Sequence, residues 1–213
     1  MLISLIHPSR GRAKKAFECY STWMLKTSCE HEIEHILSLD SDDSELDMYK
    51  ATFGNIIINN NTCVVEATNH AAKIAKGDIL IYLSDDFLCP ENWDKLIYEA
   101  IKDRINQPCL LKVDDCLQKF YADVVTIPIV TKILYDKLRY FWNPIYKSMF
   151  VDQDLYYVCK NNNWLLERPD LKFEHQHYSI GKAVKDSTYT RSDANWNQGQ
   201  TIFNERKRRN FPI

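Results

Sequence analysis

The alternation of strand-length apolar runs with helical patterns constrains the fold of this chain more than any other feature. The apolar runs have the length of buried strands and begin at Leu2, His35, Asn55, Asp78 and Cys109. Helical patterns lie between several of them, over residues 12–27, 62–76 and 90–107. Strand-helix-strand alternation predicts an α/β domain in which helices cover both faces of a mostly parallel central sheet.

Local signals predict the ends of these helices. We expect helix 62–76 to begin at a Thr62 cap and to stop at Gly77 in a left-handed conformation. Pro90 suits the first position of helix 90–107. Beyond residue 113 the pattern loosens, and we expect a helix over 152–163 and a short basic helix near the C-terminus.

Composition narrows the class of protein. A chain of 213 residues with a formal charge of -2 favours one domain and excludes a globally basic nucleic-acid-binding protein, although residues 206–209 form a local basic tail. The seven cysteines are odd in number and include no CxxC pair, so we expect reduced thiols in a cytoplasmic protein. No apolar run reaches the length of a membrane span.

Two adjacent carboxylates, Asp85 and Asp86, follow the apolar run that begins at Asp78. Ligands of open α/β sheets bind at the carboxyl ends of the strands. Like charges there repel each other unless a cation, a hydrogen-bond donor or water intervenes. Mg²⁺ or Mn²⁺ binds one or two carboxylates and completes its shell with water and phosphate oxygens. Acids at strand ends also commonly cap the next helix, so the pair alone leaves both interpretations open.

The surrounding stretch, NTCVVEATNHAAKIAKGDILIYLSDDFLCPENWD, resembles the core of GT-A glycosyltransferases of the family 2 type. In that family a helix with an Asn and small residues leads to A-x-G-D-x-(I/L), a strand and a D-x-D motif. Asn69 and residues 75–79 match this pattern, and Ser84 stands in place of the first Asp of the D-x-D motif. The resemblance implies a single GT-A domain in which residues 1–115 bind a nucleotide sugar and residues 116–213 face the acceptor.

The same resemblance implies a donor site. Its residues are expected to be Pro8, Ser9, Arg10, Asp40, Asn69, Lys73 and Asp85. Arg12 is the alternative to Arg10 near the phosphates, and Asp42 is the alternative to Asp40. Arginine suits this position because its guanidinium group binds phosphate oxygens in pairs.

The metal of the site is expected to be Mn²⁺ or Mg²⁺, and the resemblance makes Asp86 its ligand. Many GT-A enzymes complete the metal shell with a late histidine. His175 and His177 lie two apart, on one face of an extended segment, and we prefer His177 with His175 as the alternative. Both histidines could instead be buried or interface residues.

The catalytic residue is expected on the predicted helix 152–163. The stretch MFVDQDLYYVCKNNNW resembles the E-D-x-D-L segment of the family, in which Asp152 matches the catalytic acid and Val151 replaces the Glu. A carboxylate there accepts the proton of the acceptor hydroxyl as its oxygen attacks the anomeric carbon. Asp152 also suits a helix N-cap.

The resemblance implies a metal-dependent inverting glycosyltransferase with a nucleotide-diphosphate sugar donor, expected to be a UDP-sugar. The acceptor stays open among a glycan, a protein and a modified base in DNA, which the basic tail and candidate aromatic platforms would suit. Those candidate platforms are Trp93, Trp142, Tyr146 and Trp164. The alternatives are a nucleotidyltransferase with the same sheet and a non-catalytic module that binds sugar or nucleic acid.

Overall fold

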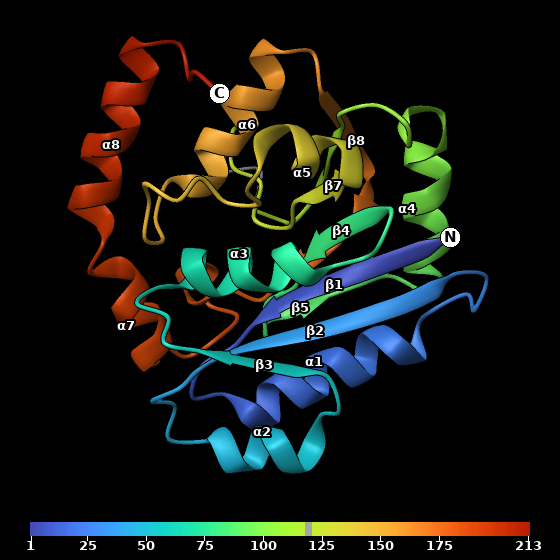
Figure 1. The fold of residues 1–213 in the computed structure, drawn as a ribbon, viewed down its shortest axis with the longest axis vertical. Coiled ribbons are helices and arrows are strands. Elements are labelled where there is room, and N and C mark those ends of the chain that lie inside the picture. Colours follow the sequence, from blue (N-terminus) through green and yellow to red (C-terminus); the bar gives the residue numbers. More distant parts are fainter. Residues whose placement is uncertain (118–120) are drawn as a thin grey trace.

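A seven-stranded sheet forms the centre of the computed structural model, which describes residues 1–117 and 121–213 (Figure 1). The strand order is β3-β2-β1-β4-β7-β6-β8. The strands are β1 Leu2–Pro8, β2 Glu32–Asp40, β3 Ile56–Asn59, β4 Ile79–Tyr82, β6 Leu110–Asp114, β7 Ile129–Thr131 and β8 Leu165–Lys172. β7 is antiparallel to both neighbours, and the other pairs are parallel. The predicted single α/β domain with a mostly parallel sheet is confirmed.

Helices cover both faces of this sheet (Figure 1). They are α1 Ala13–Leu25, α2 Leu46–Thr52, α3 Val64–Ile74, α4 Trp93–Ile101, α5 Lys132–Leu138, α6 Val151–Asn161, α7 Ser187–Asp193 and α8 Trp196–Arg208, with 3-10 turns at Lys102–Arg104 and Tyr178–Ile180. Among the described residues, none of these helices is long and apolar enough to cross a membrane.

Alternating side chains along the strands give each face its own core. Ile6 and Leu80 pack with residues of α3, α5, α6 and α8. Their neighbours Leu5 and Ile81 point to the opposite face and pack with residues of α1 and α4. This alternation follows from the period of two in a strand, and it gives the two faces of the sheet different helices to pack against.

The predicted helix over 90–107 is wrong at its beginning. Pro90 does not occupy the first helical position, because α4 begins at Trp93 after Asn92, whose backbone is left-handed with φ 56°. The helices predicted over 12–27, 62–76 and 152–163 form as α1, α3 and α6. The predicted Thr62 cap is wrong, because α3 begins at Val64 with Cys63 at the N-cap position and no side-chain cap.

Gly77 follows α3 in a different conformation from the one expected. The glycines with positive φ among the described residues are Gly11 and Gly181, so Gly77 is not a left-handed stop. Its N–H donates to the Ser4 Oγ atom at 2.8 Å, and a Cβ atom here would lie 2.6 Å from the Ser4 backbone nitrogen. Glycine is therefore required because the chain passes too close to β1 for any side chain.

Gly77→Ala is expected to lower the free energy of unfolding by about 1–3 kcal/mol, because a methyl group must displace the backbone of β1. Gly54→Ala is the matched control. A Cβ atom at Gly54 meets nothing within 4 Å, so this substitution should be close to neutral. Urea unfolding of both variants measures the difference, and equal stabilities would contradict the assignment.

The parallel strands β1, β2 and β4 all end at one edge of the sheet. A short antiparallel ribbon of β5, Phe87–Leu88, and β9, Glu174–His175, follows at that edge. α7 lies beside the ends of β1 and β2 (Figure 1), where the Thr188 hydroxyl donates to the Arg10 carbonyl at 3.1 Å. The first and last parts of the chain thus meet where a ligand of such a sheet would bind.

Candidate functional site

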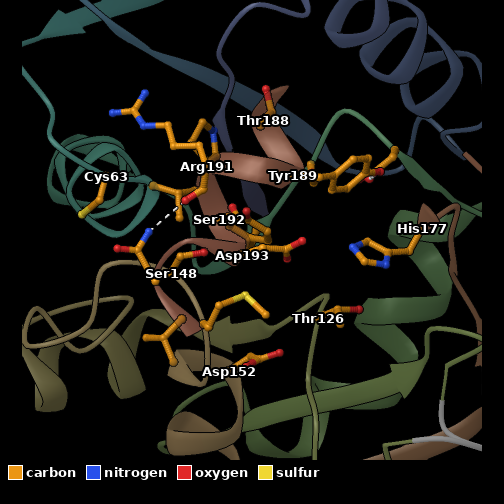
Figure 2. Close-up of a pocket in the computed structure, with 18 of the residues that line it drawn as sticks. Cys63, Thr126, Ser148, Asp152, His177, Thr188, Tyr189, Arg191, Ser192 and Asp193 are labelled. Atoms are coloured by element: carbon orange, nitrogen blue, oxygen red, sulfur yellow. Dashed lines mark hydrogen bonds between the residues drawn. The ribbon is translucent and has the colours of Figure 1, made fainter. Parts of the chain in front are cut away.

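A cavity of about 790 Å³ opens at this edge of the sheet (Figure 2). Most of the site residues predicted from the sequence line it, namely Pro8, Ser9, Arg10, Asp40, Asp85, Asp86, Asp152, His175 and His177. Residues of α7, among them Tyr189 and Arg191, line it as well. The fold therefore gathers side chains from distant segments around one space.

Asp85 directs its carboxylate into the protein. The Nε2 atom of His7 lies 2.9 Å from its Oδ1 atom, and the Ser9 hydroxyl donates to its Oδ2 atom at 3.0 Å. A guanidinium nitrogen of Arg12 lies 3.9 Å from Oδ2. His7 is fully buried, and its Nδ1 atom lies 3.0 Å from Nε2 of His35. The charge of Asp85 is thus compensated by protein groups, and a contact with the donor stays a prediction.

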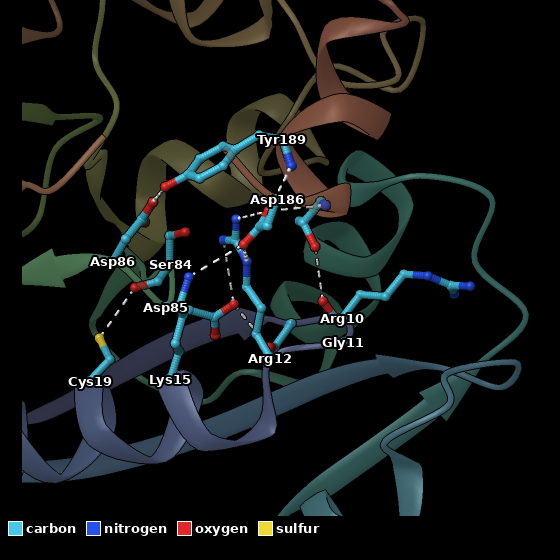
Figure 3. Close-up of polar contacts among 12 residues, drawn as sticks. Arg10, Gly11, Arg12, Lys15, Cys19, Ser84, Asp85, Asp86, Asp186 and Tyr189 are labelled. Atoms are coloured by element: carbon cyan, nitrogen blue, oxygen red, sulfur yellow. Dashed lines mark hydrogen bonds and ion pairs between the residues drawn. The ribbon is translucent and has the colours of Figure 1, made fainter. Parts of the chain in front are cut away.

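Asp86 has a different environment. Its Oδ2 atom accepts a hydrogen bond of 2.5 Å from the Tyr189 hydroxyl (Figure 3). The same atom lies 3.4 Å from Nε2 of His175. Burial, the largest influence, raises the pKa of Asp86, but the contacts with His175 and Tyr189 outweigh it and hold this pKa well below its usual range. The Oδ1 atom is buried and accepts no hydrogen bond within the described residues.

The β5–β9 ribbon decides which histidine reaches Asp86. It pairs Phe87 with His175, so His175 lies next to the carboxylate that precedes β5. His177 instead places its Nδ1 atom 2.8 Å from the Ser179 hydroxyl. Burial, with a smaller contribution from His175, lowers the pKa of His177 to about 4. His175 therefore contacts Asp86, whereas His177 was the preferred prediction.

The residues present fit a metal ion only in part. In residues 1–117 and 121–213 no group of three or more His, Cys, Asp or Glu side chains is arranged to hold one. Asp86 Oδ1 and His175 Nδ1 are nevertheless buried and unpaired within the same described part. A divalent cation that takes one carboxylate and completes its shell with phosphate oxygens and water needs no more from the protein. The unpaired oxygen of Asp86 fits such a cation, and His175 lies beside this carboxylate. The described residues do not form an all-protein metal site.

Arginines and carboxylates alternate around the remaining donor-side wall. Arg10 donates to Asp40 at 2.6 Å and to Asp42 at 2.5 Å, and Arg191 donates to Asp40 at 3.2 Å. Arg12 is buried, which the sequence did not predict. Its guanidinium group lies 4.4 Å from the ring centroid of Tyr189.

Asp186 holds Arg12 in place and explains the position of α7. The Arg12 guanidinium donates twice to Asp186, at 2.9 and 2.7 Å (Figure 3). Asp186 also caps α7 by accepting from the backbone N–H groups of Thr188 and Tyr189. No helix was predicted over Ser187–Asp193, and neither Tyr189 nor Arg191 was predicted as a site residue. An Asp directly before a helical stretch is a usual N-cap signal and was the available indication.

Two predicted donor residues lie outside the cavity wall. The Asn69 side chain donates to the Trp142 carbonyl at 2.7 Å and accepts from the backbone N–H groups of Phe141 and Trp142, both at 2.9 Å. Asn69 therefore joins α3 to the segment after α5. Lys73 is exposed on α3. The structure brings neither residue to the cavity.

Asp152 lies in the first turn of α6 and lines the cavity (Figure 2). The N-cap of α6 is Phe150, so Asp152 is not the capping residue. Burial raises the pKa of Asp152 to about 6, and the charges of Asp115 and Asp123 act in the same direction. A carboxylate with such a pKa is ionised at neutral pH yet basic enough to accept a proton.

Asp154, two residues further along α6, faces the core instead. It is 1% exposed, and its carboxylate accepts a hydrogen bond of 2.5 Å from Arg206 on α8. One basic residue of the C-terminal tail thus has a structural partner. α6 presents one carboxylate to the cavity and one to the interior.

No family model matches the sequence, and no curated protein sequence matches it. Among solved structures, the mannosyltransferase PcManGT from Pyrobaculum calidifontis, in complex with GDP-Man and Mn²⁺, matches with a TM-score of 0.65 at 13% identity, over 94% of this chain and 63% of that chain. S. aureus TarS 1-349 in complex with UDP-GlcNAc matches with a TM-score of 0.62 at 15% identity, over 96% of this chain and 71% of that chain.

A third match is glucosyl-3-phosphoglycerate synthase from Mycobacterium tuberculosis, in complex with Mn²⁺, UDP and phosphoglyceric acid. Its TM-score is 0.60 at 11% identity, over 93% of this chain and 78% of that chain. In another TarS 1-349 structure the matched region spans only 60% of that chain. These likenesses confirm the predicted GT-A fold.

Proposed function

We propose that this chain of GT-A fold is a metal-dependent glycosyltransferase that moves a sugar from a nucleotide-diphosphate donor, a UDP-sugar, to an acceptor hydroxyl with inversion. One observation carries the proposal. Asp86, with its unpaired buried oxygen, and Asp152, with its raised pKa, line the same cavity at the carboxyl ends of the strands. The complexes of similar structures with UDP, UDP-GlcNAc, GDP-Man and Mn²⁺ support it.

The donor half of the proposal concerns Asp86, His175 and the arginines. Asp86 and His175 would hold Mn²⁺ or Mg²⁺, and this cation would supply positive charge to the departing diphosphate. Arg12 and Arg191 line the same cavity and can donate paired hydrogen bonds to phosphate oxygens. Because His175 and Arg191 come from the second half of the chain, the division into a donor half 1–115 and an acceptor half 116–213 is only approximate in this proposal.

The acceptor half of the proposal concerns Asp152. As the acceptor oxygen forms its bond to the anomeric carbon, the bond from that carbon to the diphosphate breaks on the opposite face, which inverts the centre. Asp152 takes the proton that the acceptor hydroxyl loses. The nucleoside diphosphate leaves with the electron pair of the broken bond.

The pH dependence of turnover should report Asp152. With a pKa of about 6, its carboxylate is ionised above pH 6 and becomes protonated below it. We expect kcat/KM to be flat above pH 7 and to fall about tenfold per pH unit well below pH 6. Initial rates between pH 4.5 and 8 measure this, with UDP binding followed over the same range as a control. A rate that stays constant down to pH 5 would exclude this base.

The function itself is tested with a panel of UDP-, GDP- and other nucleotide sugars in the presence of Mn²⁺, together with nucleoside triphosphates. We expect saturable binding of one nucleotide sugar in calorimetry and release of its nucleoside diphosphate. Release of pyrophosphate from a triphosphate would indicate the nucleotidyltransferase instead. Binding without any product indicates the non-catalytic module, and no binding by any donor refutes the proposal.

A further inference from the structure

Trp196, the first residue of α8, is an aromatic side chain that the protein leaves partly uncovered. It is 45% exposed although it lines the cavity. Its ring meets that of Phe150 at 65° with a centroid distance of 4.9 Å, and Phe150 lines the cavity too. Covering such an exposed aromatic surface with a ligand removes apolar area from water, which favours binding.

None of the aromatic platforms predicted from the sequence offers exposed surface in the cavity wall. Trp93, Trp142 and Tyr146 are buried at 0%, 3% and 1% exposure. Trp164 lies outside the cavity wall, where the ammonium group of Lys137 lies 5.2 Å from its ring centroid. Trp196 is thus the tryptophan of the cavity wall that presents free surface.

The backbone around this pair is unusual in two ways. Phe150 has φ 71°, a left-handed conformation that bulky residues rarely adopt. A Cβ atom at Gly199 of α8 would lie 2.4 Å from the Met149 carbonyl oxygen, so only glycine lets α8 pack this closely. Both features hold Trp196 against Phe150, two residues before Asp152.

The charges near this pair disfavour an anionic ligand. Asp152 lines the cavity, and Asp115 and Asp123 add negative charge near it. Asp193 also lines the cavity and is paired with Lys185 at 2.6 Å. Lys147 and Arg191 are cations of the same wall, and Arg191 donates to Asp40 on the donor side. Arg206 of the basic tail is paired with the buried Asp154, and the rest of the tail lies further along α8. Lys207 lies eleven residues beyond Trp196 on α8, which corresponds to a rise of about 16 Å along the helix.

We infer that Trp196 and Phe150 form the platform on which an uncharged sugar acceptor stacks, with its hydroxyl groups toward Asp152. This inference rests on the proposed function and names its acceptor class. The face of a pyranose ring that carries C–H groups is apolar and covers an aromatic ring, while its hydroxyls donate to carboxylates. A nucleic acid would bring phosphates toward the acidic groups just described.

Saturation-transfer difference NMR on the full chain, with UDP and Mn²⁺ present, tests this inference. The probes are methyl glycosides of glucose, galactose, mannose and N-acetylglucosamine, their β-linked disaccharides, and a single-stranded oligodeoxynucleotide. We expect at least one neutral sugar to bind, with the strongest transfer to its ring C–H protons. Trp196→Ala should weaken that binding at least about tenfold, and Trp196→Phe should restore part of it.

Asn197→Ala is the matched control, because Asn197 is exposed on α8 next to Trp196 and lies outside the cavity wall. It should leave sugar binding unchanged. The inference is overturned if no sugar of the panel binds, if Trp196→Ala binds it as well as the original chain does, or if only the oligonucleotide binds. Calorimetry with UDP and Mn²⁺ is run on the same samples. Loss of UDP binding refutes the proposed function, whereas UDP binding without sugar binding refutes this inference alone.

Discussion

Asp152→Asn is expected to lower kcat by about 100- to 10,000-fold, the range that a positioned general base contributes. The amide keeps the shape of the side chain but cannot accept the proton of the acceptor hydroxyl. Donor affinity should not change, because this residue is assigned to the acceptor. Initial rates with the donor identified by the panel, together with calorimetry of UDP, separate the two effects.

The stability of Asp152→Asn shows whether a loss of turnover results from unfolding. The folded-state pKa of Asp152, about 6, lies above its ordinary value, so ionisation of this carboxylate opposes folding above pH 6. Asp152→Asn should therefore be at least as stable as the original chain at pH 7. Asp154→Asn, on the same helix, should instead lower the melting temperature because it weakens the buried pair with Arg206. Full turnover by Asp152→Asn would contradict the assigned role.

Asp86→Ala is expected to remove the metal dependence of donor binding. In the original chain, Mn²⁺ should strengthen UDP binding by at least about tenfold, because the cation neutralises the diphosphate while it is bound by the protein. In the variant, the UDP affinity with Mn²⁺ should equal the affinity measured with EDTA. Calorimetry with and without the metal gives both values and does not depend on turnover.

Asp85→Asn is the matched control, since it changes the neighbouring carboxylate. The carboxylate of Asp85 is in contact with His7, Ser9 and Arg12. Loss of its charge should therefore lower the stability of the fold yet preserve the effect of Mn²⁺ on UDP affinity. If Asp86→Ala retained that effect, the cation could not depend on this side chain. If Asp85→Asn lost it while remaining folded, the assignment of the two carboxylates would be reversed.

Most of the first half of the fold was predictable, because its apolar runs and helical patterns are clear, although α2 and β5 were not predicted. β7 and β8 were not predicted either. β7 has only three residues, too few for a period, and β8 has the sequence LLERPDLK, whose charges and proline argue against a central strand. β8 forms at the edge of the sheet, where a proline does not break a ladder of hydrogen bonds on both sides.

Site residues could be predicted where their place at the end of a strand brings them to the cavity. They could not be predicted where contacts between distant parts of the chain determine their partners. Asp85 and Asp86 follow β4 and therefore reach the cavity. Their different partners depend on residues far away in the chain, such as His7 and Tyr189. Likewise, a period of two places His175 and His177 on one face, but only the register of β5 with β9 brings His175 to Asp86. Asn69 matched the family pattern, yet its side chain forms hydrogen bonds with the backbone of residues 141–142 and does not line the cavity.

The ribbon of β5 and β9 also has a consequence for biosynthesis. Strands β1 to β4 can pair as soon as they leave the ribosome, since their contacts are comparatively local. β9 is added much later and joins β5 through only two residue pairs. A nascent chain that ends before Glu174 therefore contains the parallel sheet and Asp86 but lacks His175, so the contact between Asp86 and His175 forms only after β9 has been synthesised.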